Sequence, residues 1–150
     1  MFWGAVFSNG IIGVKEINNN FNSDDYIALL TNYGVRLMDM NLKHPYNIVQ
    51  DNSRVHISKK SMNYIKSQNI NCLNWPAISP DLNLIENVWK LLSDIIYSGN
   101  QPNNKQELRE MISAAVDEIN ENHRNVITKM FTDYRCRLTH ILRKSGNTIN

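Results

Sequence analysis

The chain has 150 residues, long enough for one modest domain with a buried core. Hydrophobic residues make up 42% of it and charged residues 20%, as in ordinary globular proteins, and no apolar run is long enough to span a membrane. The formal net charge of +2 does not by itself indicate nucleic-acid binding. Cys72 and Cys136 lie far apart and form no C-x-x-C pattern, which argues against a disulfide framework or a zinc site.

A hairpin and a helix are expected first along the chain. Residues 2–8 are apolar and aromatic and predict a strand, Asn9-Gly10 is a turn signal, and residues 11–17 predict the second strand. Residues 22–25 (Asn-Ser-Asp-Asp) are typical of a helix start, because they offer a capping oxygen and first-turn acids. Apolar residues then recur at helical spacing, at Tyr26, Leu30, Tyr33 and Leu37.

The middle of the chain predicts two short strands and a short helix. Residues 46–50 are a strand candidate that ends at Asp51, and residues 70–75 are another. Ser58 opens a helix between them, in which Met62 and Ile65 are expected to point inward. Residues 76–79 predict a loop, and Pro80 stands where the first turn of a helix accepts proline.

Helices are expected to complete the chain. The first carries one apolar face, made of Ile85, Val88, Trp89, Leu92, Ile95 and Ile96. Residues 99–104 break it, and two more helices are expected at about 105–120 and 123–143. Strands followed by alternating strand and helix, and then by helices, indicate a single α/β domain with a helical C-terminal layer.

The last helix is basic. Between Arg124 and Lys144 one acid, Asp133, stands against six cations: Arg124, Lys129, Arg135, Arg137, Arg143 and Lys144. Such a segment suits a phosphate backbone, although composition alone is equally compatible with a solvated helix face.

Two carboxylates, Asp51 and Glu86, are candidates for metal-dependent phosphodiester chemistry. Magnesium prefers oxygen ligands, and two ions about 3.5–4 Å apart activate the attacking oxygen and stabilise the leaving one. Asp51 is expected at the end of a strand, and Glu86 follows the apolar Ile85, so it should stand at the edge of the buried face and point toward the sheet. Spacing alone leaves another interpretation open, because an Asp after a strand is often a turn residue and a Glu early in a helix complements the helix dipole. The same holds for Asp81.

The context of these two residues resembles mariner-type transposases. Gln50-Asp51-Asn52, with His56 four residues after Asn52, is similar to the family's QDN-x-x-x-H signature, and residues 75–89 (WPAISPDLNLIENVW) are similar to its WPA-x-SPDLN-P-IEN-x-W signature. The 34 residues between Asp51 and Glu86 are a spacing that this superfamily uses. Trp3-Gly4 with residues 8–10, and Arg135-Cys136, resemble its WG…NG hairpin and its closing RC segment. Leu84 replaces the family's usual proline, and residues 53–55 depart from its Ala-Pro pair.

The resemblance implies a ribonuclease-H-like fold and a DDE-type nuclease that cuts transposon ends and joins them to target DNA. Carried over by position, Asp51 and Glu86 would be catalytic metal ligands for two Mg²⁺ or Mn²⁺ ions, and Asn52, His56 and Asn87 would shape the site. The expected partners are DNA, contacted by the basic residues near the C-terminus, and a second transposase subunit, with no membrane involved. The expected location is the nucleus.

In the sequence, the family's first catalytic aspartate is expected upstream of Met1, on a strand of its own. In the sheet of this fold, that strand lies between the hairpin and the strand before Asp51. The sheet would then have a central gap, or the hairpin would pair with a new neighbour. Three interpretations remain: a truncated transposase with little nuclease activity alone, a fragment of an active enzyme, and a non-catalytic module that binds DNA or a transposase subunit through its basic C-terminal helix.

Overall fold

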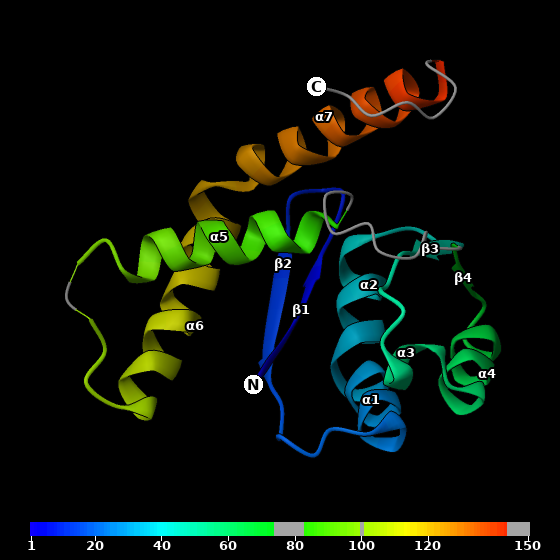
Figure 1. The fold of residues 1–150 in the computed structure, drawn as a ribbon, viewed down its shortest axis with the longest axis horizontal. Helices are drawn as coiled ribbons and strands as arrows, with labels where there is room; N and C mark the ends of the chain where they lie inside the picture. Colours follow the sequence, from blue (N-terminus) through cyan, green and yellow to red (C-terminus); the bar gives the residue numbers. More distant parts are fainter. Residues whose placement is uncertain (74–82, 100, 144–150) are drawn as a thin grey trace. The chain divides into compact units, whose positions relative to one another are not determined.

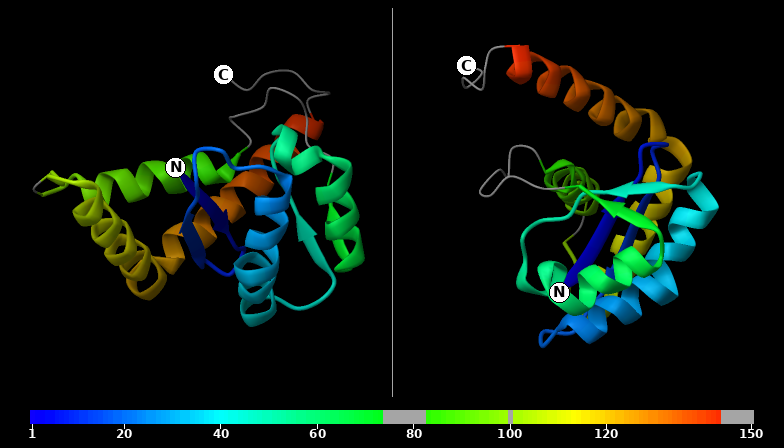
Figure 2. Two further views of the ribbon diagram at one scale, coloured as in Figure 1. Left: turned by 90° about the horizontal axis from the view of Figure 1, so that it is seen from below. Right: turned by 90° about the vertical axis from the view of Figure 1, so that its right-hand side faces the viewer.

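The structure is a computed structural model that describes residues 1–73, 83–99 and 101–143, except that the side chains of Arg135 and of residues 137–143 are not described. The chain divides into two compact units. The first contains Met1–Phe7 and Gly13–Ser79, and the second contains Ser8–Ile12 and Pro80–Asn150. Figures 1 and 2 show the elements of each. No helix among the described residues has the length and apolar character needed to cross a membrane.

The predicted N-terminal hairpin is confirmed. Strands β1 (Phe2–Val6) and β2 (Ile12–Glu16) pair with each other, and the amide of Ile17 donates to the carbonyl of Met1 at 2.9 Å (Figure 1). Gly10 in the turn has a φ of 88°, a conformation that glycine adopts without steric cost. The Asn9-Gly10 signal therefore marked the turn correctly.

A continuous helical segment follows, made of α1 (Ser23–Leu29), the π-helical turn η1 (Leu30–Gly34) and α2 (Val35–Asn41). Asn22 caps its start: its side-chain oxygen accepts from the amides of Asp24 and Asp25, and the carboxylate of Asp25 accepts from the amide of Asn22. This reciprocal capping box satisfies amides that a helix leaves unpaired, and it confirms the predicted start.

The two short strands in the middle of the chain form a separate parallel pair. Strand β3 (Tyr46–Ile48) lies beside β4 (Ile70–Cys72), with Tyr46 opposite Ile70. The described strands thus form two two-stranded sheets, and the hairpin is not paired with β3. Strand β3 is shorter than the predicted strand 46–50, and the amide of Leu73 bonds to the carbonyl of Ile48, its last residue. Residues 74 and 75 of the predicted second strand lie outside the described residues.

Helices α3 (Arg54–Ile57) and α4 (Lys59–Ser67) lie between these strands in the sequence. Ser58 caps α4 by accepting from the amide of Ser61, which confirms the predicted start. Ile65 is buried as predicted, but the inward position of Met62 is wrong, since Met62 is 36% exposed. Ser61 takes the inward place: it is fully buried, and its hydroxyl donates to the carbonyl of Val55 at 2.5 Å.

The described helices of the second unit are α5 (Leu84–Ile96), α6 (Lys105–Asn122) and α7 (Arg124–Arg143). The bounds of α6 and α7 are close to those predicted, but α5 begins four residues after Pro80, because Asn83 has an extended backbone and caps the helix. Val88, Leu92 and Ile96 form the buried face of α5. Asn120 of α6 makes two bonds to Ile12, the first residue of β2: its side chain accepts from the amide of Ile12 at 2.8 Å and donates to the carbonyl of Ile12 at 3.0 Å. The loop predicted at residues 76–79, Pro80 and Asp81 lie outside the described residues.

Candidate active site

Asp51 lies in the loop between β3 and α3, three residues after Ile48, and not at the end of a strand as predicted. Its Oδ1 accepts from the amide of Ser53 at 3.0 Å, a local turn that positions the carboxylate. The same oxygen lies 2.7 Å from Nδ1 of His56. With Asp51 ionised, Nδ1 is the donor, so both bonds fall on Oδ1 and the other oxygen, Oδ2, makes no hydrogen bond to a described residue.

The side chain of His56 is more buried than that of Asp51. Its side chain is 17% exposed, against 55% for that of Asp51. The imidazole lies 4.6 Å from the ring of Tyr26 in α1, with the planes tilted by 45°. His56 therefore contacts the buried Tyr26 on one side and the exposed carboxylate of Asp51 on the other.

Gln50 connects the same partners by a second route. Its Oε1 accepts from the hydroxyl of Tyr26 at 2.7 Å, and its Nε2 donates to the carbonyl of His56 at 3.2 Å. Tyr26 is 3% exposed, and burial, followed by the nearby Cys72 and Asp51, raises the pKa of its hydroxyl well above the ordinary value. The hydroxyl thus stays protonated and remains a donor. Tyr26, Gln50 and His56 together form a network behind Asp51.

Glu86 belongs to the second unit and lies in the first turn of α5. Its amide bonds to the carbonyl of Asn83, whose side chain caps the helix by accepting from the amide of Ile85. The prediction that Glu86 stands at the edge of the buried face is wrong, because Glu86 is exposed. The reason is helical geometry: Glu86 precedes the buried Val88 by two residues, which places it about 200° around the helix.

The remaining predicted site residues are on the surface where they are described. Asn52 and Asn87 are exposed beside Asp51 and Glu86, and Arg124 and Lys129 are exposed on α7. Arg135, Arg137 and Arg143 lie within α7, but their side chains, like all of Lys144, are outside the described part. The structure therefore brings Asp51 and His56 together, and it describes Glu86 only within its own unit.

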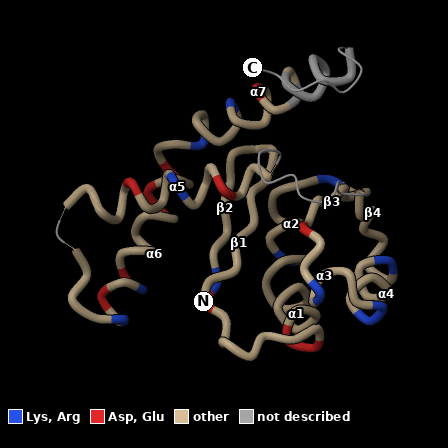
Figure 3. Tube along the Cα trace, in the orientation of Figure 1, with Lys and Arg blue, Asp and Glu red and all other residues tan. Residues whose placement is uncertain are grey.

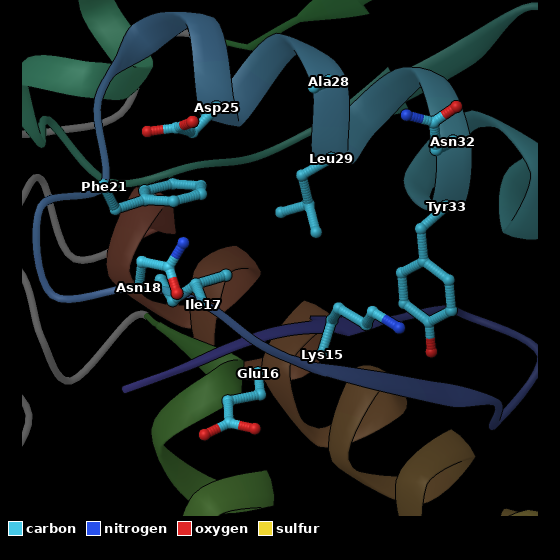
Figure 4. A pocket seen from close by; sticks show the side chains of 10 residues that line it. All are labelled: Lys15, Glu16, Ile17, Asn18, Phe21, Asp25, Ala28, Leu29, Asn32 and Tyr33. Atoms are coloured by element: carbon cyan, nitrogen blue, oxygen red, sulfur yellow. The ribbon is translucent and has the colours of Figure 1, made fainter.

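The described residues contain no grouped metal ligands, and the first unit has a further pocket. In the described part of the chain, no three His, Cys, Asp or Glu residues are grouped so as to hold a metal ion, and Cys72 and Cys136 are both free thiols. A pocket of about 360 Å³ in the first unit has Leu29 and Tyr33 directed from the helical segment toward β2 (Figure 4). The ammonium of Lys15, also in its lining, lies 5.9 Å from the centre of the Tyr33 ring. None of the predicted site residues lines this pocket.

Comparison with known proteins identifies the family. The family model for DDE superfamily endonucleases matches residues 2–109, most of the chain. The chain belongs to this family. The Tc3 transposase of Caenorhabditis elegans is 32% identical over 151 residues, covering all of this chain and 45% of the relative. The Tcb1 transposase of Caenorhabditis briggsae is 28% identical over 114 residues, covering 76% of this chain and 42% of the relative.

A solved structure supports the fold. The catalytic domain of Mos1 mariner transposase matches with a TM-score of 0.73 at 13% identity, over 95% of this chain and 72% of that one. This confirms the predicted ribonuclease-H-like fold of a DDE domain, and the relatives place the chain among the Tc1/mariner transposases. The chain spans less than half the length of the two relatives.

Proposed function

We propose that this chain is part of a transposase catalytic domain that cleaves DNA and transfers strands in a metal-dependent reaction, with Asp51 and Glu86 as metal ligands. The observation that carries the proposal is the fixed Asp51 carboxylate: His56 and Ser53 occupy Oδ1, and Oδ2 makes no bond to a described residue. Such an arrangement of outer partners orients ligating carboxylates in metalloenzymes.

The donor set fits magnesium or manganese. Carboxylate oxygens are the ligands that these hard cations prefer, and both acids are exposed. When bound, the metal would activate the attacking oxygen and stabilise the leaving one. The chain's own part is to hold each carboxylate on an ordered element, Asp51 through its bond to His56 and Glu86 in the capped first turn of α5. The DNA would be that of transposon ends and target, and the place of action the nucleus.

Manganese binding to the full chain tests the metal ligands. Asp51→Asn and Glu86→Gln remove charge without removing volume, so each should weaken Mn²⁺ binding about 10-fold or more in calorimetry or electron paramagnetic resonance. Asp94→Asn is the matched control, because Asp94 is an exposed acid on the same helix as Glu86. Binding that is equal in all four proteins would overturn the assignment.

A nicking assay with Mn²⁺ on supercoiled DNA then tests the reaction. Cleavage that is lost in both variants would show that the chain is active as it stands. Metal binding without cleavage would leave Asp51 and Glu86 as ligands of an incomplete site. DNA binding without metal binding would favour the alternative function, a non-catalytic module that uses the basic helix α7, on which Arg124 and Lys129 are exposed.

A further inference from the structure

Positive charge is concentrated in a second segment, apart from α7. Residues 52–80 contain four cations (Arg54, Lys59, Lys60 and Lys66) and no Asp or Glu, which leaves the other 121 residues with 12 cations and 14 acids. The net charge of the whole chain, +2, is smaller than the charge of four cations in this one segment. Figure 3 shows Lys and Arg along α3 and α4 of the first unit.

Helix α4 directs part of this charge to one exposed face. Lys59, Met62, Asn63 and Lys66 follow one another at spacings of three, one and three residues, so they share about 100° of the helix surface, and all four are exposed. We call these residues the α4 basic face. The buried Ser61 and Ile65 lie on the other side of the helix, where they anchor it to the first unit.

Among the described residues, no acid forms an ion pair with the lysines of this face. Asp24 of α1, which packs on α4, accepts from Lys60 through both of its oxygens at 3.0 Å, and β4 carries no charged residue. Lys59 and Lys66 make no ion pair with a described residue. Lys59 and Lys60 also occupy the first turn of α4, where the helix dipole favours acids, so helix stability does not explain them.

The α4 basic face lies next to the Asp51 loop. Nε2 of Gln50, the residue before Asp51, is 3.7 Å from the sulfur of Met62, at the edge of the face. Arg54 begins α3 three residues after Asp51 and is exposed. An anion that follows the α4 basic face would therefore be led toward the candidate carboxylate by cations on α4 and α3.

We infer that the α4 basic face binds the phosphate backbone of the DNA that approaches Asp51, with Lys59 and Lys66 as the phosphate contacts. The choice of DNA rests on the proposed function, and two single charges seven residues apart on one helix face suit separate phosphates of a repeating phosphodiester chain. The lysines position the strand, and they read no sequence.

Salt-dependent binding tests this inference. The full chain is titrated in EDTA against a fluorescein-labelled duplex of mixed sequence, and anisotropy gives the affinity at several salt concentrations. Lys59→Gln/Lys66→Gln should make the negative slope of log K against log salt shallower by about 1.8. If the two lines meet at 1 M salt, the affinity of this variant at 0.1 M salt is about 60-fold lower than that of the original chain. Lys59→Arg/Lys66→Arg should bind like the original chain.

The matched control is Lys43→Gln/Lys90→Gln, which removes the same charge from two other exposed positions. Equal weakening by both Gln pairs, or none by Lys59→Gln/Lys66→Gln, would overturn the inference. Binding of the original chain to phosphatidylserine vesicles but not to DNA would overturn it in favour of a membrane surface. The DNA titration is run in EDTA and so without metal. Its outcome therefore does not depend on whether the chain binds Mn²⁺. A chain that binds no DNA at all would overturn both the inference and the proposed DNA partner.

Discussion

The network behind Asp51 predicts measurable coupling between Tyr26 and Gln50. Tyr26→Phe removes the hydroxyl that donates to Gln50 and keeps the buried ring, so it should lower the free energy of unfolding by about 1 kcal/mol. Gln50→Ala leaves the buried hydroxyl of Tyr26 without its acceptor and also removes the bond to the carbonyl of His56. A buried polar group without a partner costs about 1–3 kcal/mol, so we expect a loss of about 2–3 kcal/mol.

The double variant should lose less than the sum of the two. Once Tyr26 is Phe, no buried hydroxyl is left unpaired when Gln50 is shortened, and the second change should cost about 1 kcal/mol. The coupling is then about 1–2 kcal/mol, above the roughly 0.3–0.5 kcal/mol within which independent sites add. Urea unfolding followed by far-ultraviolet circular dichroism at pH 7 measures all four proteins.

A second double-mutant cycle, on Thr31 and Tyr64 of the same unit, is the control for a hydrogen bond that is exposed. The hydroxyl of Thr31 donates to the carbonyl of Ile27 and lies 2.8 Å from the hydroxyl of Tyr64, which is then the donor to Thr31, but this bond is exposed. Tyr64→Phe and Thr31→Ala should therefore couple by less than about 0.5 kcal/mol, since water replaces the lost partner. If Tyr26 and Gln50 also prove additive, the hydrogen bond contributes nothing specific, and the proposed support of the Asp51 loop is refuted.

Two further predictions concern the hairpin turn and alkaline stability. Gly10→Ala should lower the free energy of unfolding by about 3 kcal/mol or more in a urea titration, because a Cβ at its positive φ would collide with the backbone of α7, whereas Gly99→Ala meets no atom within 4 Å and should be nearly neutral. The hydrogen bond from Tyr46 to Asp39 raises the pKa of Tyr46 from 10.0 to about 12, so its contribution to stability is complete below pH 10 and is lost as the pH rises to about 12. Tyr46→Phe should be less sensitive to pH than the original chain over that interval, and equal slopes would contradict this assignment.

Local signals account for what the sequence predicted well. The turn at Asn9-Gly10 and the capped helix start at Asn22 depend on neighbouring residues, so short sequence patterns contain the necessary information. The C-terminal end of α5 and the bounds of α6 and α7 were also close, because glycine, proline and asparagine interrupt the apolar spacing between these helices.

Tertiary packing decided what the sequence predicted poorly. Met62 and Ile65 are both apolar at helical spacing, but the small Ser61, with Val55 as its acceptor, takes the inward position and leaves Met62 on the surface. Glu86 follows an apolar residue, yet the buried line of α5 begins at Val88, about 200° around the helix from Glu86. Periodicity counts apolar residues, and it does not tell which of two possible faces the rest of the chain covers.

At the candidate site too, the sequence identified the residues but not their contacts, and the structure explains the five-residue spacing of Asp51 and His56. The motif placed His56 five residues after Asp51 and gave it no partner, whereas the structure shows its Nδ1 on Oδ1 of Asp51, with Ser53 as the second donor to that oxygen. Five residues suffice because the chain turns at Asp51 and enters α3, which carries His56 back toward the carboxylate. A metal ligand at this place needs one oxygen fixed and one open, and the spacing supplies the donor that fixes it. His56→Ala should therefore weaken Mn²⁺ binding, although this variant keeps the aspartate at position 51.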